Sequence, residues 1–209
     1  IRKKPRLAAN KKAIINQMMW LAKSHYELEF SLDSAISERV IFPTSEAERN
    51  GIEDARFVKF TDQNGEVTYY ATYTAYDGTT ILPRLLETNN FYHFKALPIH
   101  GELARNKGMA LFPRKIKGNY AMLCRIDGVN NYISYSDRIN IWRSAKLIQK
   151  PKFPWDMVQV GNCGSPVETE EGWLVITHGV GPMREYVLGA SLYELDNPEK
   201  EIGRLKTPL

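Results

Sequence analysis

Apolar residues follow two different periods along this chain. From Ala13 to Tyr26 they recur at intervals of three and four, with Asn10 placed to cap the segment, so the pattern predicts a helix with one buried face. After Glu29 apolar and polar positions alternate in short stretches separated by turn residues, which is typical of strands. The sequence therefore predicts an all-β protein, and we expect residues 1–36 to form the helix and a lead-in strand.

The strand-like stretches repeat with a period of about fifty residues. Each repeat has a strand, a turn around a glycine and an aromatic-rich strand, followed by two further strand-like segments. The turn glycines Gly65, Gly118 and Gly172 are 53 and 54 residues apart. Four strands in a repeat of this length indicate β-propeller blades, whereas a β-sandwich does not predict equal spacing. We expect blades around residues 52–100, 106–150 and 160–209.

Three blades are too few to close a propeller, because closed rings typically have four to eight. An open stack of blades leaves two sheet edges exposed, which proteins normally avoid. We therefore expect residues 37–209 to be a partial propeller cut from a longer chain. A second copy could cover the exposed edges, so a homo-oligomer is a further expectation.

Composition and charge exclude some classes of function. The 28 Lys and Arg residues exceed the 24 Asp and Glu residues by only four, too few to indicate nucleic-acid binding. No apolar run reaches the roughly 18 residues that span a membrane. Cys124 and Cys163 stand alone, without metal-ligand spacing. We expect a cytoplasmic protein with no metal site and with neither nucleic acid nor membrane as a partner.

Unusual polar residues occupy equivalent positions in the three repeats. They stand at the start of each repeat and in the loop after its second strand: Glu53, Asp54, Arg56, Tyr76 and Asp77; Asn106, Lys107, Arg125 and Asp127; Asn162, Cys163 and His178. In a propeller these positions gather around one axis, so carboxylates, cations and a histidine would meet there. Simpler interpretations stay open. Arg56 could be no more than an ion-pair partner of Glu53, and His178 could be a partly buried histidine with satisfied hydrogen bonds.

Four segments resemble successive motifs of glycoside hydrolase family 130. They read GIEDARF, NKGMALFPRKIKGNYAMLCR, CGSPVETEEGWLVITHGV and YVLGASLYELDNPEKEIGR, and the resemblance runs from about Ser37 to Leu209. Members of this family are longer five-bladed β-propellers. Many are inverting β-mannoside phosphorylases and some are β-1,2-mannosidases. The resemblance implies that this chain holds about three of the five blades.

The resemblance also implies that Asp54, the aspartate of the Glu-Asp pair, is the general acid. Neighbouring residues of a strand point to opposite faces, so Glu53 would be structural or would hold Arg56. In an inverting reaction a carboxyl group protonates the departing oxygen while a nucleophile attacks from the opposite face. In the family's phosphorylases the nucleophile is inorganic phosphate, so no catalytic base is required.

Phosphate attack needs cations and hydrogen-bond donors that hold the anion. The candidate phosphate-binding residues are Arg125, His178, Arg184 and Tyr186, and the candidate substrate-binding residues are Glu53, Arg56, Tyr76, Asp77, Asn106 and Lys107. One departure weakens the anion site: where the family's phosphorylases usually have the lysine of KIGAGPP, this chain reads QVGNCGSP, with Gln159. A hydrolase would instead need a carboxylate base, for which Asp77, Asp127 and Glu168 remain undecided candidates.

The sequence therefore predicts an enzyme that cleaves a β-mannoside oligosaccharide with phosphate and inverts the anomeric centre, giving α-mannose 1-phosphate. Phosphate is the co-substrate, and no cofactor is expected. Two alternatives stay open. One is an inverting β-mannosidase, and the other is a carbohydrate-binding propeller without catalysis, against which the retained Asp54 argues.

Overall fold

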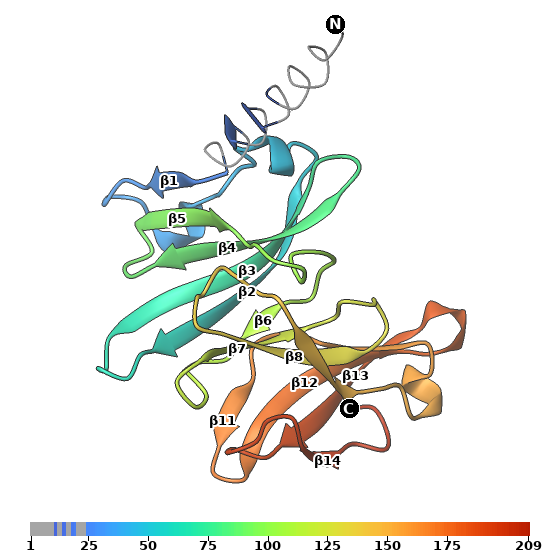
Figure 1. Ribbon diagram of the computed structural model, residues 1–209. Helices are drawn as coiled ribbons and strands as arrows, with labels where there is room; N and C mark the ends of the chain where they lie inside the picture. The colour runs from blue at the N-terminus through green and yellow to red at the C-terminus, as the bar shows by residue number, and fades with distance from the viewer. Residues whose placement is uncertain (1–10, 12–13, 16–17, 20–23) are drawn as a thin grey trace, which may run out of the picture.

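The computed structural model describes residues 11, 14–15, 18–19 and 24–209, and these residues form three antiparallel sheets (Figure 1). The first sheet has the order β1-β5-β4-β3-β2, with β1 (Tyr26–Glu29), β2 (Ile52–Thr61), β3 (Val67–Tyr76), β4 (Ile81–Thr88) and β5 (His93–Pro98). The second has β6 (Ala110–Leu111), β7 (Tyr120–Cys124), β8 (Asn131–Ser136) and β9 (Ala145–Gln149) in order. The third has the order β10-β12-β13-β14, with β11 paired to β12; the strands are β10 (Gln159–Asn162), β11 (Val167–Thr169), β12 (Gly172–Val180), β13 (Tyr186–Tyr193) and β14 (Glu201–Arg204).

Single 3-10 turns join these strands. They are η1 (Ile36–Glu38), η2 (Glu46–Glu48), η3 (Pro154–Asp156) and η4 (Pro182–Arg184). No helix in the part of the chain that the structure describes has the length and apolar character to cross a membrane.

Period-two alternation explains how the second sheet packs on both neighbours. Leu111 and Met122 lie opposite each other and belong to the apolar cluster shared with the first sheet. The adjacent pair, Ala110 and Leu123, belongs to the cluster shared with the third sheet. Successive side chains of a strand point to opposite faces, so one short hairpin supplies both interfaces.

Large side chains fill the two interfaces. The first contains Val58, Phe60, Tyr70 and Leu85 of the first sheet with Met122, Cys124 and Trp142 of the second region. The other contains Phe112, Ala121 and Ile133 with Trp173, Val175 and Tyr193 of the third sheet. The sheets thus stack face to face as propeller blades do, and the described strands do not close a ring. The predicted all-β propeller fold is confirmed.

The N-terminal prediction holds only in part. Most of the predicted helix lies outside the described residues; residues 11, 14–15 and 18–19 are helical, but Ile14 and Met18 are 57% and 65% exposed rather than buried. The predicted helix end at Tyr26 is wrong, because Tyr26 begins β1 and pairs with Ala96 of β5. The segment Tyr26–Glu29 reads YELE, with alternating burial, so a period of two prevails over the helical period there.

A buried carboxylate fixes the segment before β2 against the far face of the first sheet. Glu48 is fully buried and accepts hydrogen bonds from the hydroxyls of Tyr26 (3.0 and 3.1 Å) and Tyr73 (2.5 Å). The guanidinium of Arg84 lies 3.6 Å from it. Burial alone would raise the pKa of Glu48, but the bonds from Tyr73 and Ser45 and the charge of Arg84 outweigh it and lower the pKa.

We expect Glu48→Gln to lower the free energy of unfolding by about 3–5 kcal/mol, because it leaves the buried Arg84 guanidinium without a carboxylate. Urea denaturation at pH 7 measures the loss. Because folding lowers the pKa of Glu48, its ionised carboxylate adds to the free energy of unfolding above pH 4.5, the ordinary pKa of a glutamate. That stabilisation is lost as the pH falls below this value. The control is Glu168→Gln, whose pair with Arg114 is exposed and worth about 1 kcal/mol or less. Equal losses in both variants would contradict the prediction.

Candidate active site

A bulge in β2 directs Asp54 out of the regular strand. The pairing of β2 with β3 shifts register between Glu53 and Arg56, and Asp54 has a φ of 58°. A non-glycine residue in this left-handed region costs about 1–3 kcal/mol and persists only where the surroundings hold it. Bulges of this kind re-aim side chains beside active sites.

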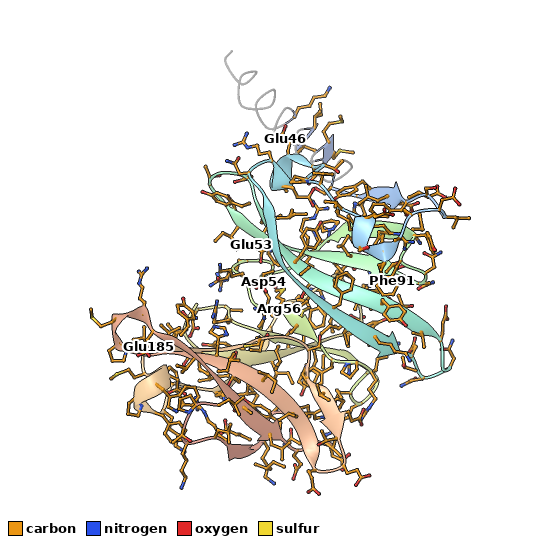
Figure 2. The ribbon with its side chains drawn as sticks, turned by 180° about the vertical axis from the view of Figure 1, so that it is seen from behind. Glu46, Glu53, Asp54, Arg56, Phe91 and Glu185 are labelled. Carbon is orange, nitrogen blue, oxygen red and sulfur yellow. The ribbon has the colours of Figure 1, made fainter. Side chains whose placement is uncertain are left out.

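Arg56 holds the carboxylate of Asp54 with two parallel hydrogen bonds. Its Nε lies 3.0 Å from Oδ1 and its Nη2 lies 2.8 Å from Oδ2. Figure 2 shows Glu53, Asp54 and Arg56 following one another along β2 on the side that faces the other sheets. Glu53 pairs instead with Lys107 (3.2 Å), so the interpretation that Arg56 only pairs with Glu53 is wrong. We call Asp54 and Arg56 the acid pair.

Arg125 and His178 meet beside the acid pair. Arg125 Nη1 lies 2.9 Å from His178 Nε2, and Tyr186 stacks on the imidazole with ring centroids 6.1 Å apart. A Cβ built on Gly108 would lie 3.8 Å from both Arg56 Nη1 and Arg125 Cβ, so the two arginines flank the same glycine. We call Arg125, His178 and Tyr186 the anion cluster.

The histidine of the anion cluster is neutral at pH 7. Burial lowers the pKa of His178 to about 4, and the charges of Arg125 and Arg56 act in the same direction. Since a guanidinium only donates hydrogen bonds, His178 Nε2 accepts from Arg125 and the ring proton sits on Nδ1, 3.7 Å from Cys163 Sγ. Arg125 itself is only 8% exposed and stays charged.

Gly161 and Gln159 of β10 complete this cluster. A Cβ on Gly161 would lie 2.5 Å from His178 Cε1 and 2.7 Å from Arg125 Nη1, so only glycine leaves room for the contact. Gln159 satisfies both ends of its amide when its nitrogen donates to Gly128 O (3.1 Å) and its oxygen accepts from Arg125 Nη1. A neutral amide therefore bonds the arginine.

Other candidate residues lie at the rim of this region. Tyr76 shares a hollow with Asn50, Ile52 and Glu53, and its hydroxyl donates to Gly78 O (2.8 Å). Asn106 has a left-handed φ of 67° and lines a second hollow with Arg105 and Ile126.

Arg184 belongs to η4, an exposed turn two residues before Tyr186, and has a φ of 60°. It is therefore close to the anion cluster in sequence but fully on the surface.

Each carboxylate considered as a catalytic base is bound elsewhere. Asp77 accepts from the backbone of Thr79 and Thr80 (2.8 and 2.7 Å), and these bonds lower its pKa. Burial raises the pKa of Asp127, but hydrogen bonds from its own loop hold that pKa at about 2.

Glu168 forms a two-pronged pair with Arg114 (2.8 and 2.5 Å). It lies opposite Trp173, five residues along β12 from His178, or roughly 17 Å. Asp77 and Asp127 accept hydrogen bonds within their own loops, and Glu168 is paired with Arg114. None of the three carboxylates is therefore free to activate water.

Two further residues of the site, Gly161 and Asn162, were not among the candidates for catalysis or binding. Asn162 is 1% exposed, and its backbone carbonyl accepts from Arg56 Nη1 at 3.1 Å. The sequence shows Asn162 as a polar residue at the start of a repeat. It does not show the contact with Arg56, which lies 106 residues earlier. The described His, Cys, Asp and Glu residues do not gather in groups of three or more as metal ligands would.

Known proteins resemble this chain along most of its length. The model of a family described as beta-1,4-mannooligosaccharide phosphorylase, glycoside hydrolase family 130, matches residues 10–209. The 1,2-beta-oligomannan phosphorylase of Thermoanaerobacter sp. (strain X514) is 33% identical over 180 residues, which cover 83% of this chain and 58% of that protein. The beta-1,2-mannobiose phosphorylase of Listeria innocua is 30% identical over 197 residues, 90% of this chain and 52% of its own length.

Solved structures share the fold. The complex of the Listeria innocua enzyme with beta-1,2-mannobiose superposes with a TM-score of 0.69 at 28% identity, over 81% of this chain and 48% of that one. A putative glycoside hydrolase from Parabacteroides distasonis gives 0.67 at 20% identity, over 81% of this chain and 57% of its own, and shows the fold alone. The chain spans about half the length of the curated relatives it matches. It belongs to glycoside hydrolase family 130.

Proposed function

We propose that this chain carries the acid and part of the anion site of an inverting β-mannoside phosphorylase. The observation that carries the proposal is the placement of the acid pair beside the anion cluster, with Asp77, Asp127 and Glu168 all bound elsewhere. An inverting hydrolase needs a carboxylate base for water. A phosphorylase needs an anion site instead.

Asp54 is the proton donor in this mechanism and acts in its protonated form, in which one carboxyl oxygen still accepts from Arg56. Its side chain is 38% exposed, so the carboxyl group can reach a bound sugar while Arg56 fixes its orientation. The proton passes to the departing glycosidic oxygen as the bond from that oxygen to the anomeric carbon breaks. A phosphate oxygen forms the new bond from the opposite face, so a β-mannoside yields α-mannose 1-phosphate and a shortened sugar.

The anion cluster supplies donors for the phosphate. Arg125 is the buried charge of this cluster; its Nε is enclosed and has no hydrogen-bond partner among the described residues, so an anion would reach this donor only after a neighbouring side chain moves. The hydroxyl of Tyr186 and the exposed guanidinium of Arg184 extend the donors toward solvent. Gln159 adds a neutral amide where a lysine would add charge, so Arg125 carries most of the electrostatic attraction.

The substrate sugar occupies the rim beside Asp54 in this proposal. Glu53, Tyr76 and Lys107 present polar groups there, and Asn106 lines the neighbouring hollow. Asp77 shapes this rim by holding its own loop rather than by contacting sugar. The names of the relatives include both β-1,2 and β-1,4 linkages, so both are tested.

We expect the intact enzyme to release α-mannose 1-phosphate from β-1,2- or β-1,4-mannobiose only when inorganic phosphate is present, because phosphate is the nucleophile. Phosphorus NMR of the product identifies the sugar phosphate and its anomeric configuration. Equal release of mannose with and without phosphate would instead identify a hydrolase. Binding of sugar without turnover would identify a carbohydrate-binding protein.

We expect Asp54→Asn to lower kcat by about 10²–10⁴-fold, the usual contribution of a general acid, while mannoside binding persists because the shape is kept. The matched control is Glu53→Gln at the neighbouring position. Its ion pair with Lys107 is exposed and it lies at the sugar rim, so its loss should act on KM and change kcat by no more than about fivefold. Comparable losses of kcat in the two variants would show that Asp54 is the wrong choice of general acid.

We expect Gly161→Ala to raise the KM for phosphate about 10- to 100-fold, because the new methyl group displaces Arg125 or His178 and removes a charged hydrogen bond. Gly164→Ala is the control, since a Cβ there meets nothing within 4 Å. Steady-state kinetics with varied phosphate measures both. An unchanged KM for phosphate in Gly161→Ala would show that the anion cluster does not bind phosphate.

A further inference from the structure

Asn162 lies buried where the three sheets meet. Its side-chain oxygen and its carbonyl both accept hydrogen bonds from Arg56 Nη1 of the first sheet. Its side-chain nitrogen donates to Gly108 O (2.8 Å), just before the second sheet. Its backbone nitrogen donates to Asn131 Oδ1 (3.1 Å) of β8. One residue of β10 thus bonds three separate segments.

The bonds to Arg56 decide how its guanidinium is oriented. Nε and Nη2 serve Asp54, while Nη1 serves Asn162. A guanidinium is planar, so fixing one edge against a buried amide fixes the direction of the other edge. Asp54, whose backbone is strained, receives its two hydrogen bonds from that other edge.

The neighbouring residue of β10 belongs to the anion cluster. Gly161 packs against Arg125 and His178, whereas Asn162 bonds Arg56. Consecutive residues of one strand therefore contact the anion cluster and the acid pair. Because the strand is rigid, the dipeptide Gly161-Asn162 sets the distance between the acid pair and the anion cluster.

We propose that Asn162 is a positioning residue, which sets Asp54 relative to the anion cluster through Arg56. The inference rests on the proposed function. An in-line displacement needs the acid and the nucleophile on opposite faces of the anomeric carbon, and a misplacement of about 1 Å can cost roughly 10²-fold in rate. Asn162 itself does not contact the reacting atoms.

A double-mutant cycle in the intact enzyme tests this proposal. We expect Asn162→Ala to lower kcat about 10- to 100-fold with little change in the KM for mannoside. Arg56→Lys removes the fork that holds the carboxylate and should also lower kcat. Because Asn162 acts through Arg56, the double variant should be no slower than Arg56→Lys alone. Losses that multiply would overturn the proposal.

Gln149→Met is the control for a merely structural role. Gln149 is buried, bonds Asn131, Ser191 and Glu201 between the second and third sheets, and does not touch Arg56. It accepts from Asn131 Nδ2, whereas Asn162 N donates to Asn131 Oδ1, so the bond to Asn162 has its own acceptor atom in the variant. It should lower the melting temperature but leave kcat within about threefold of the wild type, as expected for a site outside the reaction geometry. An equal loss of kcat in Gln149→Met and Asn162→Ala would overturn the proposal.

Crystal structures provide a readout that needs no turnover. In Asn162→Ala, or in Asn162→Ser should the alanine variant fail to fold, we expect Arg56 to adopt another rotamer and the Asp54 carboxylate to move by about 1 Å or more. An unchanged acid pair in a folded variant would overturn the proposal. Absence of turnover by the wild-type enzyme, with or without phosphate, would refute the proposed function instead and leave this structural comparison decisive.

Discussion

Each sheet of this protein has two faces that must be covered, and the rest of the structure depends on that constraint. The second sheet satisfies it with alternating side chains that pack on both neighbours. The first sheet packs its far face against residues 41–48, where the Glu48–Arg84 pair is enclosed by hydroxyl groups. The third sheet has Trp155 lying over Gly179 and Gly189, where an added Cβ would be 2.4 and 2.5 Å from the indole. Apolar stacking therefore sets how the three sheets lie against one another.

Polar residues gather where this stacking ends, in β2, in β10 and directly after β7. The bulge at Asp54, the buried guanidinium of Arg125 and the amide of Asn162 all lie there. Unpaired polar groups are costly in such surroundings. Asp54 and Asn162 are both bonded to Arg56, and Arg125 is bonded to His178. The same contacts that satisfy these polar groups also orient the side chains to which we assign proton transfer and phosphate binding.

The fold was largely predictable because its signals are local. Alternation and the glycine turns near residues 65, 118 and 172 indicate strands whatever surrounds them. A lead-in strand before residue 37 was predicted, but its start at Tyr26 was not, because a four-residue alternation follows directly on a helical period and gains its pairing only from β5. Long-range pairing decides such short segments.

The site was predictable to a smaller extent. Arg125 and His178 stand at equivalent places in the repeats, and they are in hydrogen-bond contact. Asp77 and Asp127 share that equivalence, yet each caps its own loop, as the following DGTT and DGVNN sequences would have suggested. The roles of Gly161 and Asn162 depend on packing between sheets, which no local pattern carries.

The contact between Arg56 and Asn162 joins residues 106 positions apart, and this separation has a consequence during synthesis. Chains grow at about 5–20 residues per second, and N-terminal parts begin to fold first. Arg56 therefore leaves the ribosome about 5–20 seconds before its partner does. Throughout that interval the first sheet can form its apolar layers, but its arginine lacks the amide that orients it. The geometry that we propose for catalysis is thus acquired only after Asn162 has been synthesised, later than the apolar layers of the first sheet.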